Sequence, residues 1–246
     1  MRAVLLLFLL LVSSGTAHAA PEIQVVYLKG GCFPMGDGFG SGGPEEKPVH
    51  PVCVDGFNMG KYLVTQSQWQ QVMGDNPSYF VRCGADCPVE KVSWEDAREF
   101  LRRLNEQTGK SYRLPYEAEW EYAARSGGKM EQWAGTSDPD DLGAFAWLES
   151  NSGRSTHPVG TRRPNGLGLY DMTGNLWQWC QDYFDEAYYR ESPEKNPQGP
   201  LSGVNRVLRG GSWDDGAGRA RATLRYSYGP FSRYYNFGLR VVLPAS

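Results

Sequence analysis

The stretch RVLRGGSWDDGAGRARATLRYSYGPFSRYYNFGLRVV, residues 206–242, is rich in Trp, Tyr, Arg and Gly. It contains no Cys and no His, and its only carboxylates are Asp214 and Asp215. Apolar residues at its two ends predict short strands over 205–213 and 236–244. Because rigid aromatic rings among small residues are typical of ligand-binding surfaces, the residues between the strands predict a site.

Three helices are predicted ahead of this stretch. The first covers 67–74 and follows Thr65, a candidate N-cap. The second covers 93–109, and its opening Ser-Trp-Glu-Asp places a carboxylate at the capping-box position. The third covers 115–128, from a Pro to a Gly pair, which are typical first and last residues of a helix.

Further strands are predicted over 23–31 and 52–65, whereas 127–202 shows many Gly, Pro, Asn and Asp and little regular pattern. A long irregular region in a compact domain is usually stabilised by metal ions or by packed aromatic side chains. The chain has eight Trp and fourteen Tyr, which can bury a ring and keep a polar tip in water. We therefore expect one α+β domain with little regular secondary structure over 21–246.

The first twenty residues are typical of a cleaved export signal. Arg2 gives a positive start, residues 3–12 carry no charge, and Ala17 and Ala19 are small residues at the positions that a signal peptidase reads. The apolar run of about ten residues is short of the ~20 that a spanning helix needs. We therefore expect a periplasmic or secreted protein with no membrane span, cut after Ala19 or Ala20.

Charge and cysteine content narrow the class of protein. Removing Arg2 leaves 24 basic against 28 acidic residues, a net charge of 24 − 28 = −4, which argues against a nucleic-acid partner. Five cysteines remain, and an oxidising compartment favours their pairing. Cys83 with Cys87 is the first pair expected, Cys32 with Cys53 the second, and Cys180 is expected to be a buried free thiol. A zinc site at the C-x3-C spacing is the alternative, but no second pair or His lies at ligand spacing.

Several segments, in fixed order, resemble one family. They are GGCFPMGD, PVHPVCVDGFNMGKYLVTQSQWQQVM, PVEKVSWEDAREFLRRLN, YRLPYEAEWEYAARSG, RPNGLGLYDMTGNLWQWCQDYF, RVLRGGSW and NFGLRVV. Together they look like the formylglycine-generating enzymes, also called sulfatase-modifying factors, and they span nearly all of the mature chain. This resemblance implies a single-domain C-type-lectin-like fold.

The resemblance also implies a chemistry that this chain lacks the residues to perform. The name-giving activity uses two cysteines after the GGS motif, which bind copper and oxidise a substrate cysteine to formylglycine. Counted from Gly210-Gly211-Ser212, the matching positions are Asp215 and Ala220. Soft metals prefer thiolates, whereas Asp is a hard oxygen ligand and Ala offers none. The sequence therefore argues against copper and against formylglycine formation.

A calcium site is a second implication of the resemblance. The implied ligands are the side chains of Asp171 and Gln178 and the carbonyls of Gly174 and Leu176. All four donate oxygen, which suits a hard cation. Gln178 stands where the family has Glu and Asp171 where Asn is common, which keeps the ligand charge at about −1 and allows weak structural calcium binding. The alternative is a loop held by Asn175 and two flanking Trp residues.

Binding of a protein or a small ligand is the function that the sequence favours. The C-terminal segment resembles the diversified binding surfaces that some members of this fold carry, although ordinary members also have Tyr-rich, Arg-rich tails there. The candidate binding residues are Ser212, Trp213, Asp214, Asp215, Arg219, Arg221, Tyr226, Tyr228, Phe231, Tyr234 and Tyr235. Aromatic anchors among Gly and Ser have the composition of a paratope.

Two other functions remain open on the sequence. One is an exported oxidoreductase or maturation enzyme of the same family with a different site chemistry, in which a carboxylate acts as base. No residue pattern supplies a redox centre for it, and His50 and His157 are scattered among loops. The other is a scaffold with a fixed partner in an envelope complex, which would use the same surface as a binding protein.

Overall fold

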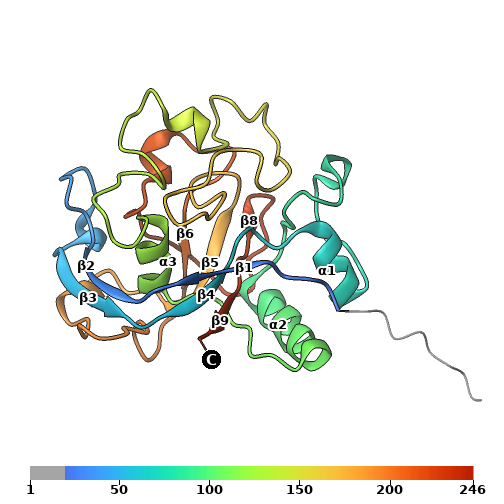
Figure 1. The fold of residues 1–246 in the computed structure, drawn as a ribbon, viewed down its shortest axis with the longest axis horizontal. Coiled ribbons are helices and arrows are strands. Elements are labelled where there is room, and N and C mark those ends of the chain that lie inside the picture. Colours follow the sequence, from blue (N-terminus) through green and yellow to red (C-terminus); the bar gives the residue numbers. More distant parts are fainter. Residues whose placement is uncertain (1–19, 246) are drawn as a thin grey trace, which may run out of the picture.

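The computed structural model describes residues 20–245, and Figure 1 shows their arrangement. All but the last residue of the expected export signal lies outside the described residues. No helix in the described part is both long and apolar enough to cross a membrane.

The helices are α1 (Gln66–Met73), α2 (Trp94–Thr108) and α3 (Glu117–Ala124). The predicted capping box of α2 is confirmed, because Ser93 accepts from the Asp96 amide and the Asp96 side chain accepts from the Ser93 amide. Thr65 caps α1 in the same way. The expected range of the third helix was wrong by a few residues at each end. It ends earlier because the chain takes positive φ at Ser126 and at both following glycines.

Within residues 20–245, nine strands form three sheets. A three-stranded antiparallel sheet has the order β1 (Val25–Leu28), β4 (Phe57–Gly60), β9 (Val242–Pro244). A two-stranded antiparallel ribbon joins β2 (Gly31–Met35) and β3 (His50–Val54). The third sheet has the order β7 (Tyr226–Tyr228), β6 (Arg206–Arg209), β5 (Trp177–Tyr183), β8 (Phe237–Gly238), with β8 parallel to β5.

The strand predictions were right in place but wrong in number. The range 52–65 is divided by a turn into β3 and β4, and 236–244 is divided into β8 and β9, which belong to different sheets. Three strands were missed: β2 shares only Gly31 with a predicted range, β5 lies within the range expected to be irregular, and β7 lies between the two C-terminal predictions.

The four-stranded sheet is buried on both faces. Cys180 and Val207 pack with Trp120 of α3, whereas Trp179 and Leu208 pack in the cluster that contains Phe100 of α2. Figure 1 places α3 and α2 on opposite sides of β5. A strand buried on both faces need not alternate polar and apolar residues, and β5 includes the buried polar residues Gln178 and Asp182, so its pattern does not indicate a strand.

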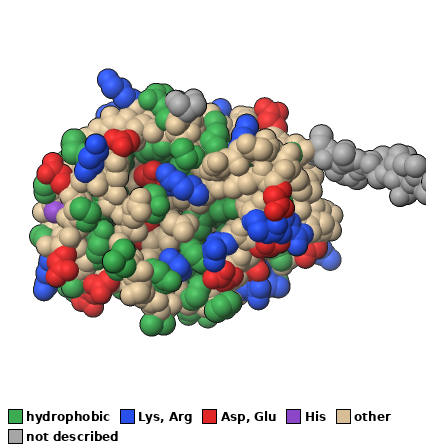
Figure 2. All heavy atoms as spheres, turned by 90° about the horizontal axis from the view of Figure 1, so that it is seen from below, with side chains coloured by type: hydrophobic (Ala, Val, Ile, Leu, Met, Phe, Trp, Pro, Cys, Tyr) green, Lys and Arg blue, Asp and Glu red, His purple; other side chains and the backbone are tan. Residues whose placement is uncertain are grey.

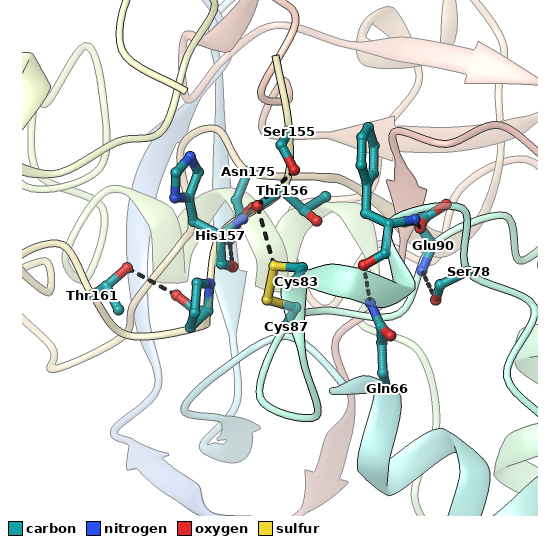
Figure 3. Close-up of a disulfide and its surroundings, with 12 residues drawn as sticks. Gln66, Ser78, Cys83, Cys87, Glu90, Ser155, Thr156, His157, Thr161 and Asn175 are labelled. Carbon is teal, nitrogen blue, oxygen red and sulfur yellow. Dashed lines mark hydrogen bonds between the residues drawn. A yellow bond between two sulfur atoms is a disulfide. The ribbon is translucent and has the colours of Figure 1, made fainter. Parts of the chain in front are cut away.

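Both expected disulfides are present. Cys32 lies opposite Cys53 in the ribbon of β2 and β3, and the two are bonded. Cys83 is bonded to Cys87, and Cys180 is a buried free thiol, as expected. The Cys83 Sγ lies 3.2 Å from the carbonyl oxygen of Thr156 (Figure 3), so this small loop packs against the irregular region.

Candidate functional site

A tight turn after β6 starts the candidate site. Gly210 and Gly211 have φ of 99° and 70°, values that residues with a Cβ rarely adopt. A Cβ on Gly211 would lie 2.8 Å from Ala220, so the returning chain packs directly on the glycine. The turn therefore fixes the segment that follows it, which includes Asp214 and Asp215.

The two carboxylates lie beside the buried Ser212 and form an acidic pair. Ser212 Oγ donates to Asp214 Oδ1 at 2.6 Å and also contacts the Asp215 carboxylate. Asn236 Nδ2 donates to Asp214 at 3.0 Å, and Arg219 Nε lies 2.9 Å from Asp215 Oδ1. Burial raises the pKa of Asp215, while Ser212 and Arg219 favour its ionised form. Each acid is thus held by neighbouring side chains.

One aromatic group borders the acidic pair, and we call it the outer group: Tyr79, Phe80, Trp213 and Tyr235. The ring of Trp213 lies 5.3 Å from that of Phe80 and 5.7 Å from that of Tyr235, centroid to centroid. Tyr79 lies 6.3 Å from Tyr235 and is 67% exposed. Trp213 is buried beneath, so the outer group presents tyrosine rings to solvent on a tryptophan base.

A second aromatic group covers the end of the four-stranded sheet, and we call it the sheet group: Trp177, Tyr226, Tyr228 and Tyr234. Tyr226 packs on Trp177 at 4.9 Å, and Tyr234 packs on Tyr228 at 4.9 Å with their hydroxyl oxygens 3.1 Å apart. The Trp177 side chain is hydrogen-bonded to the Asp215 carboxylate. The Arg219 guanidinium lies 5.0 Å from the ring centre of Tyr226. These contacts connect the sheet group to the acidic pair.

Two candidate residues lie apart from this arrangement. Arg221 is buried, and both its terminal nitrogens lie 2.7 Å from oxygens of Glu46. Phe231 is 74% exposed, but no aromatic ring in the described chain pairs with it. Arg221 therefore does not belong to the candidate binding surface, since a ligand would have to displace the Glu46 carboxylate to reach it.

Tyr79, Phe80, Trp177 and Asn236 belong to the site but were not among the candidates. Tyr79 and Phe80 are more than 130 residues before Trp213 in the sequence, so no local spacing connects them. Two adjacent aromatic residues in a loop rich in Asn, Pro and Ser, NPSYF, were the signal that could have found them. The sequence places Trp177 in the implied calcium loop, whereas its side chain is hydrogen-bonded to Asp215 of the acidic pair.

A network of buried charges holds the chain beneath this surface. All its members are buried: Glu46, Glu117, Glu121, Arg209, Arg221 and Arg225. Arg209 lies 2.5 Å from Glu121 and donates to the carbonyl oxygens of Ala222, Thr223 and Leu224. Arg225 binds both oxygens of Glu117 at 2.8 and 2.9 Å. The network therefore fastens the segment between the turn and β7 to α3.

The two histidines weighed for metal chemistry are not brought together. The ring of His50 packs on Tyr189 at 4.6 Å, whereas that of His157 stacks on Trp147 at 3.6 Å. No cluster of three or more His, Cys, Asp or Glu side chains that could hold a metal occurs among residues 20–245.

The two side chains among the implied calcium ligands, those of Asp171 and Gln178, are already engaged by protein donors. Asp171 accepts from the Gly160 amide at 2.9 Å and from Asn175 at 3.3 Å. Gln178 Oε1 accepts from the Trp120 indole at 2.9 Å and from Arg240 Nε at 3.0 Å. The buried guanidinium of Arg240 supplies a positive charge in this loop. Burial lowers the pKa of Arg240 to about 10, and the nearby Asp171 carboxylate opposes this change.

As arranged, the Asp171 and Gln178 side chains direct their oxygens at different protein donors, and a calcium ion would have to displace some of these bonds. Calcium binding stays a prediction that a chelation experiment decides. Since protein donors already satisfy the loop, we expect the melting temperature to be equal within about 1 °C in 1 mM CaCl₂ and in EGTA. A rise of several degrees with calcium, abolished by Asp171→Ala, would show that the ion displaces these bonds.

Comparison with known proteins places the chain among relatives. The model of the sulfatase-modifying factor enzyme 1-like domain matches residues 13–245. The formylglycine-generating enzyme of Streptomyces coelicolor is 34% identical, with 87% of each chain covered. The solved structure of Treponema denticola variable protein 1 is similar with a TM-score of 0.85 at 30% identity, covering 93% of this chain and 97% of that one.

A second solved structure, PvdO from Pseudomonas aeruginosa, is similar with a TM-score of 0.76 at 25% identity and covers 90% of this chain and 94% of its own. These likenesses extend over nearly the whole described chain and confirm the predicted single-domain C-type-lectin-like fold. The chain belongs to the sulfatase-modifying factor, or formylglycine-generating enzyme, family.

Proposed function

We propose that this chain is an exported member of the family that binds a protein or small ligand through the face formed by the acidic pair and the two aromatic groups. The observation that carries the proposal is what stands at the two positions matched to the copper cysteines. Asp215 is paired with Arg219, and Ala220 is fully buried in an apolar cluster with Trp133 and Leu148. No cysteine follows Ser212 anywhere in the sequence.

The composition of the face supports binding by aromatic anchors. Tyr79, Tyr234 and Tyr235 are 67%, 40% and 46% exposed, and each packs against another ring of the face that limits its motion. Rings held in place in this way lose little conformational entropy when a partner covers them. The acidic pair between the two groups adds polar contacts that orient a ligand.

The solved relative from Treponema denticola is named a variable protein. A diversified surface over 214–236 is the corresponding proposal for this chain, and a fixed surface is its alternative. Sequencing the flanking DNA decides between the two: a near-identical template repeat beside a reverse-transcriptase gene supports diversification, and absence of both leaves a fixed surface.

The absence of oxidase activity gives the first test. A peptide carrying a sulfatase-type Cys, incubated with the mature protein, Cu(I) and oxygen, should lose its thiol no faster than in buffer, because soft copper has no thiolate pair to bind here. The Streptomyces coelicolor enzyme, assayed in parallel, is the positive control. Thiol loss with repeated turnover would refute this part of the proposal.

The binding face gives the second test. A partner is captured from envelope extracts, identified by mass spectrometry and titrated with purified variants. Tyr235→Ala and Tyr226→Ala should each weaken binding about tenfold or more, as expected of central aromatic anchors. Tyr27→Ala is the matched control, because Tyr27 is 61% exposed on β1 and belongs to neither aromatic group. Equal affinity of all variants would exclude this face.

A further inference from the structure

Glu90 is a fully buried carboxyl group directly beneath the outer aromatic group. Its Oε1 accepts from the backbone amide of Phe80 at 2.8 Å, and the backbone amide of Tyr79 also interacts with the carboxyl group. Its Oε2 has no hydrogen-bond partner among the described residues. Figure 3 shows Glu90 beside Ser78, whose hydroxyl accepts from the Glu90 amide at 3.3 Å.

The position of Glu90 connects both aromatic groups. Through Phe80 and Tyr79 it holds the loop that carries half of the outer group. The next residue, Lys91, has a positive φ of 59° and donates its amide to the carbonyl oxygen of Tyr234 in the sheet group at 3.0 Å. A shift of the loop at residues 78–80 would therefore change the spacing of rings on the face.

Glu90 changes its charge state near neutral pH. Burial raises the pKa of Glu90 to about 7, and the two amide donors and the Lys91 ammonium oppose this rise only in part. Charged groups on the neighbouring elements are engaged elsewhere: Asp96 of α2 pairs with Arg233, and Arg219 pairs with Asp215. Buried carboxylates without a paired charge are costly, which favours either a proton on Glu90 or exposure of its side chain.

We propose that Glu90 is a positioning residue for the ligand-binding face, holding Tyr79 and Phe80 in place when neutral and releasing their loop when ionised. Its effect on ligand binding rests on the proposed function, whereas the movement of the loop does not.

The direction of the pH dependence follows from linkage. In the closed loop Glu90 keeps its proton up to about pH 7, whereas in an open loop its pKa returns to the ordinary value near 4.5. The stability that the Glu90 proton adds to the closed loop is therefore fully present below pH 4.5 and is lost as the pH rises through about 7. Between pH 5.5 and pH 8 the equilibrium constant for opening should increase about 30-fold.

Hydrogen exchange of the full chain without ligand tests the proposal. The readout is the protection factor of the Tyr79 and Phe80 amides, corrected for intrinsic exchange, at pH 5.5 and pH 8. We expect protection about 30-fold lower at pH 8, and amides of α1 serve as internal reference. Glu90→Gln, which mimics the neutral acid, should remove the pH dependence, whereas Glu95→Gln on the exposed side of α2 should keep it.

Equal protection at the two pH values in the native chain would overturn the proposal, as would the same pH dependence in Glu90→Gln. If Glu90→Gln fails to fold, the native pH profile alone still decides, because α1 amides report any global change. Affinity for the identified partner is then compared at the two pH values. Loss of partner binding in all conditions, with pH-dependent protection intact, would refute the proposed function and leave this inference standing.

Discussion

Replacing Arg209 with Met is expected to lower the free energy of unfolding by about 3–5 kcal/mol, because Glu121 and Glu117 would each lose one of the two buried cations that they contact. Arg209 is fully buried at the end of β6, 2.5 Å from Glu121 and 3.7 Å from Glu117. Burial alone would raise the pKa of Glu117, but Arg225 and Arg209 hold it below its usual value. Removing one of these cations therefore makes the ionised form of Glu117 more costly.

The same substitution also removes bonds to the backbone. Arg209 donates to three successive carbonyl oxygens, at residues 222–224, which would lose their donors. An unsatisfied buried acceptor costs about 1–3 kcal/mol. The loss should thus be felt in the segment that leads into β7, and Tyr226 and Tyr228 should become more mobile than the core.

Urea denaturation at pH 7 measures the effect. Arg102→Met on the exposed face of α2, where Arg102 pairs with Glu99 and Glu106, is the control and should not shift the midpoint measurably. The double variant Arg209→Met with Glu121→Gln should recover none of the loss, because Glu121 also pairs with the buried Arg125 at 3.0 Å, which would then lack its carboxylate. A loss below about 1 kcal/mol for Arg209→Met would show that the network contributes little to stability.

The elements that the sequence predicted well carry their determinants locally. The capping boxes at Thr65 and Ser93 place two interacting residues within one turn, so a pattern four residues long identifies them. β5 has no such signal, because its neighbours β6 and β8 come from residues 206–209 and 237–238 and cover both its edges. Its residues, WQWCQDY, form neither a continuous apolar run nor a strict alternation, so hydrophobic periodicity does not indicate a strand there.

The sequence predicts which kinds of residue form the site, but it does not predict all the residues that belong to it. The sequence indicated an aromatic surface with an acidic pair after the GGS turn, and the structure brings most of those side chains together. It could not indicate that Arg221 points inward, since its partner Glu46 is 175 residues away in the chain. The adjacent rings in NPSYF mark Tyr79 and Phe80 as candidates, but no local pattern connects them to Trp213 and Tyr235, and a bond from the Phe80 amide to the buried Glu90 holds their loop.

The Cys32–Cys53 disulfide gives a prediction of comparable size. It joins residues 21 apart and directly opposite each other in the two-stranded ribbon of β2 and β3. In the chain-entropy model, closing a loop of this length stabilises the folded state by about 3 kcal/mol. The double variant Cys32→Ala with Cys53→Ala should therefore unfold at a clearly lower urea concentration.

The second disulfide supplies the matched comparison, because it closes a loop between residues only 4 apart. Cys83→Ala with Cys87→Ala should cost about 1.5 kcal/mol less than removing Cys32–Cys53, since the entropy of loop closure grows with the logarithm of loop length.

A thiol titration of the unsubstituted protein in denaturant should find one free thiol, that of Cys180, which shows that both bonds are intact before unfolding is measured. Equal losses for the two double variants would mean that native packing around each bond, rather than restriction of the unfolded chain, sets their contribution. A ranking by loop length would instead mean that this protein depends on an oxidising compartment mainly through the ribbon of β2 and β3.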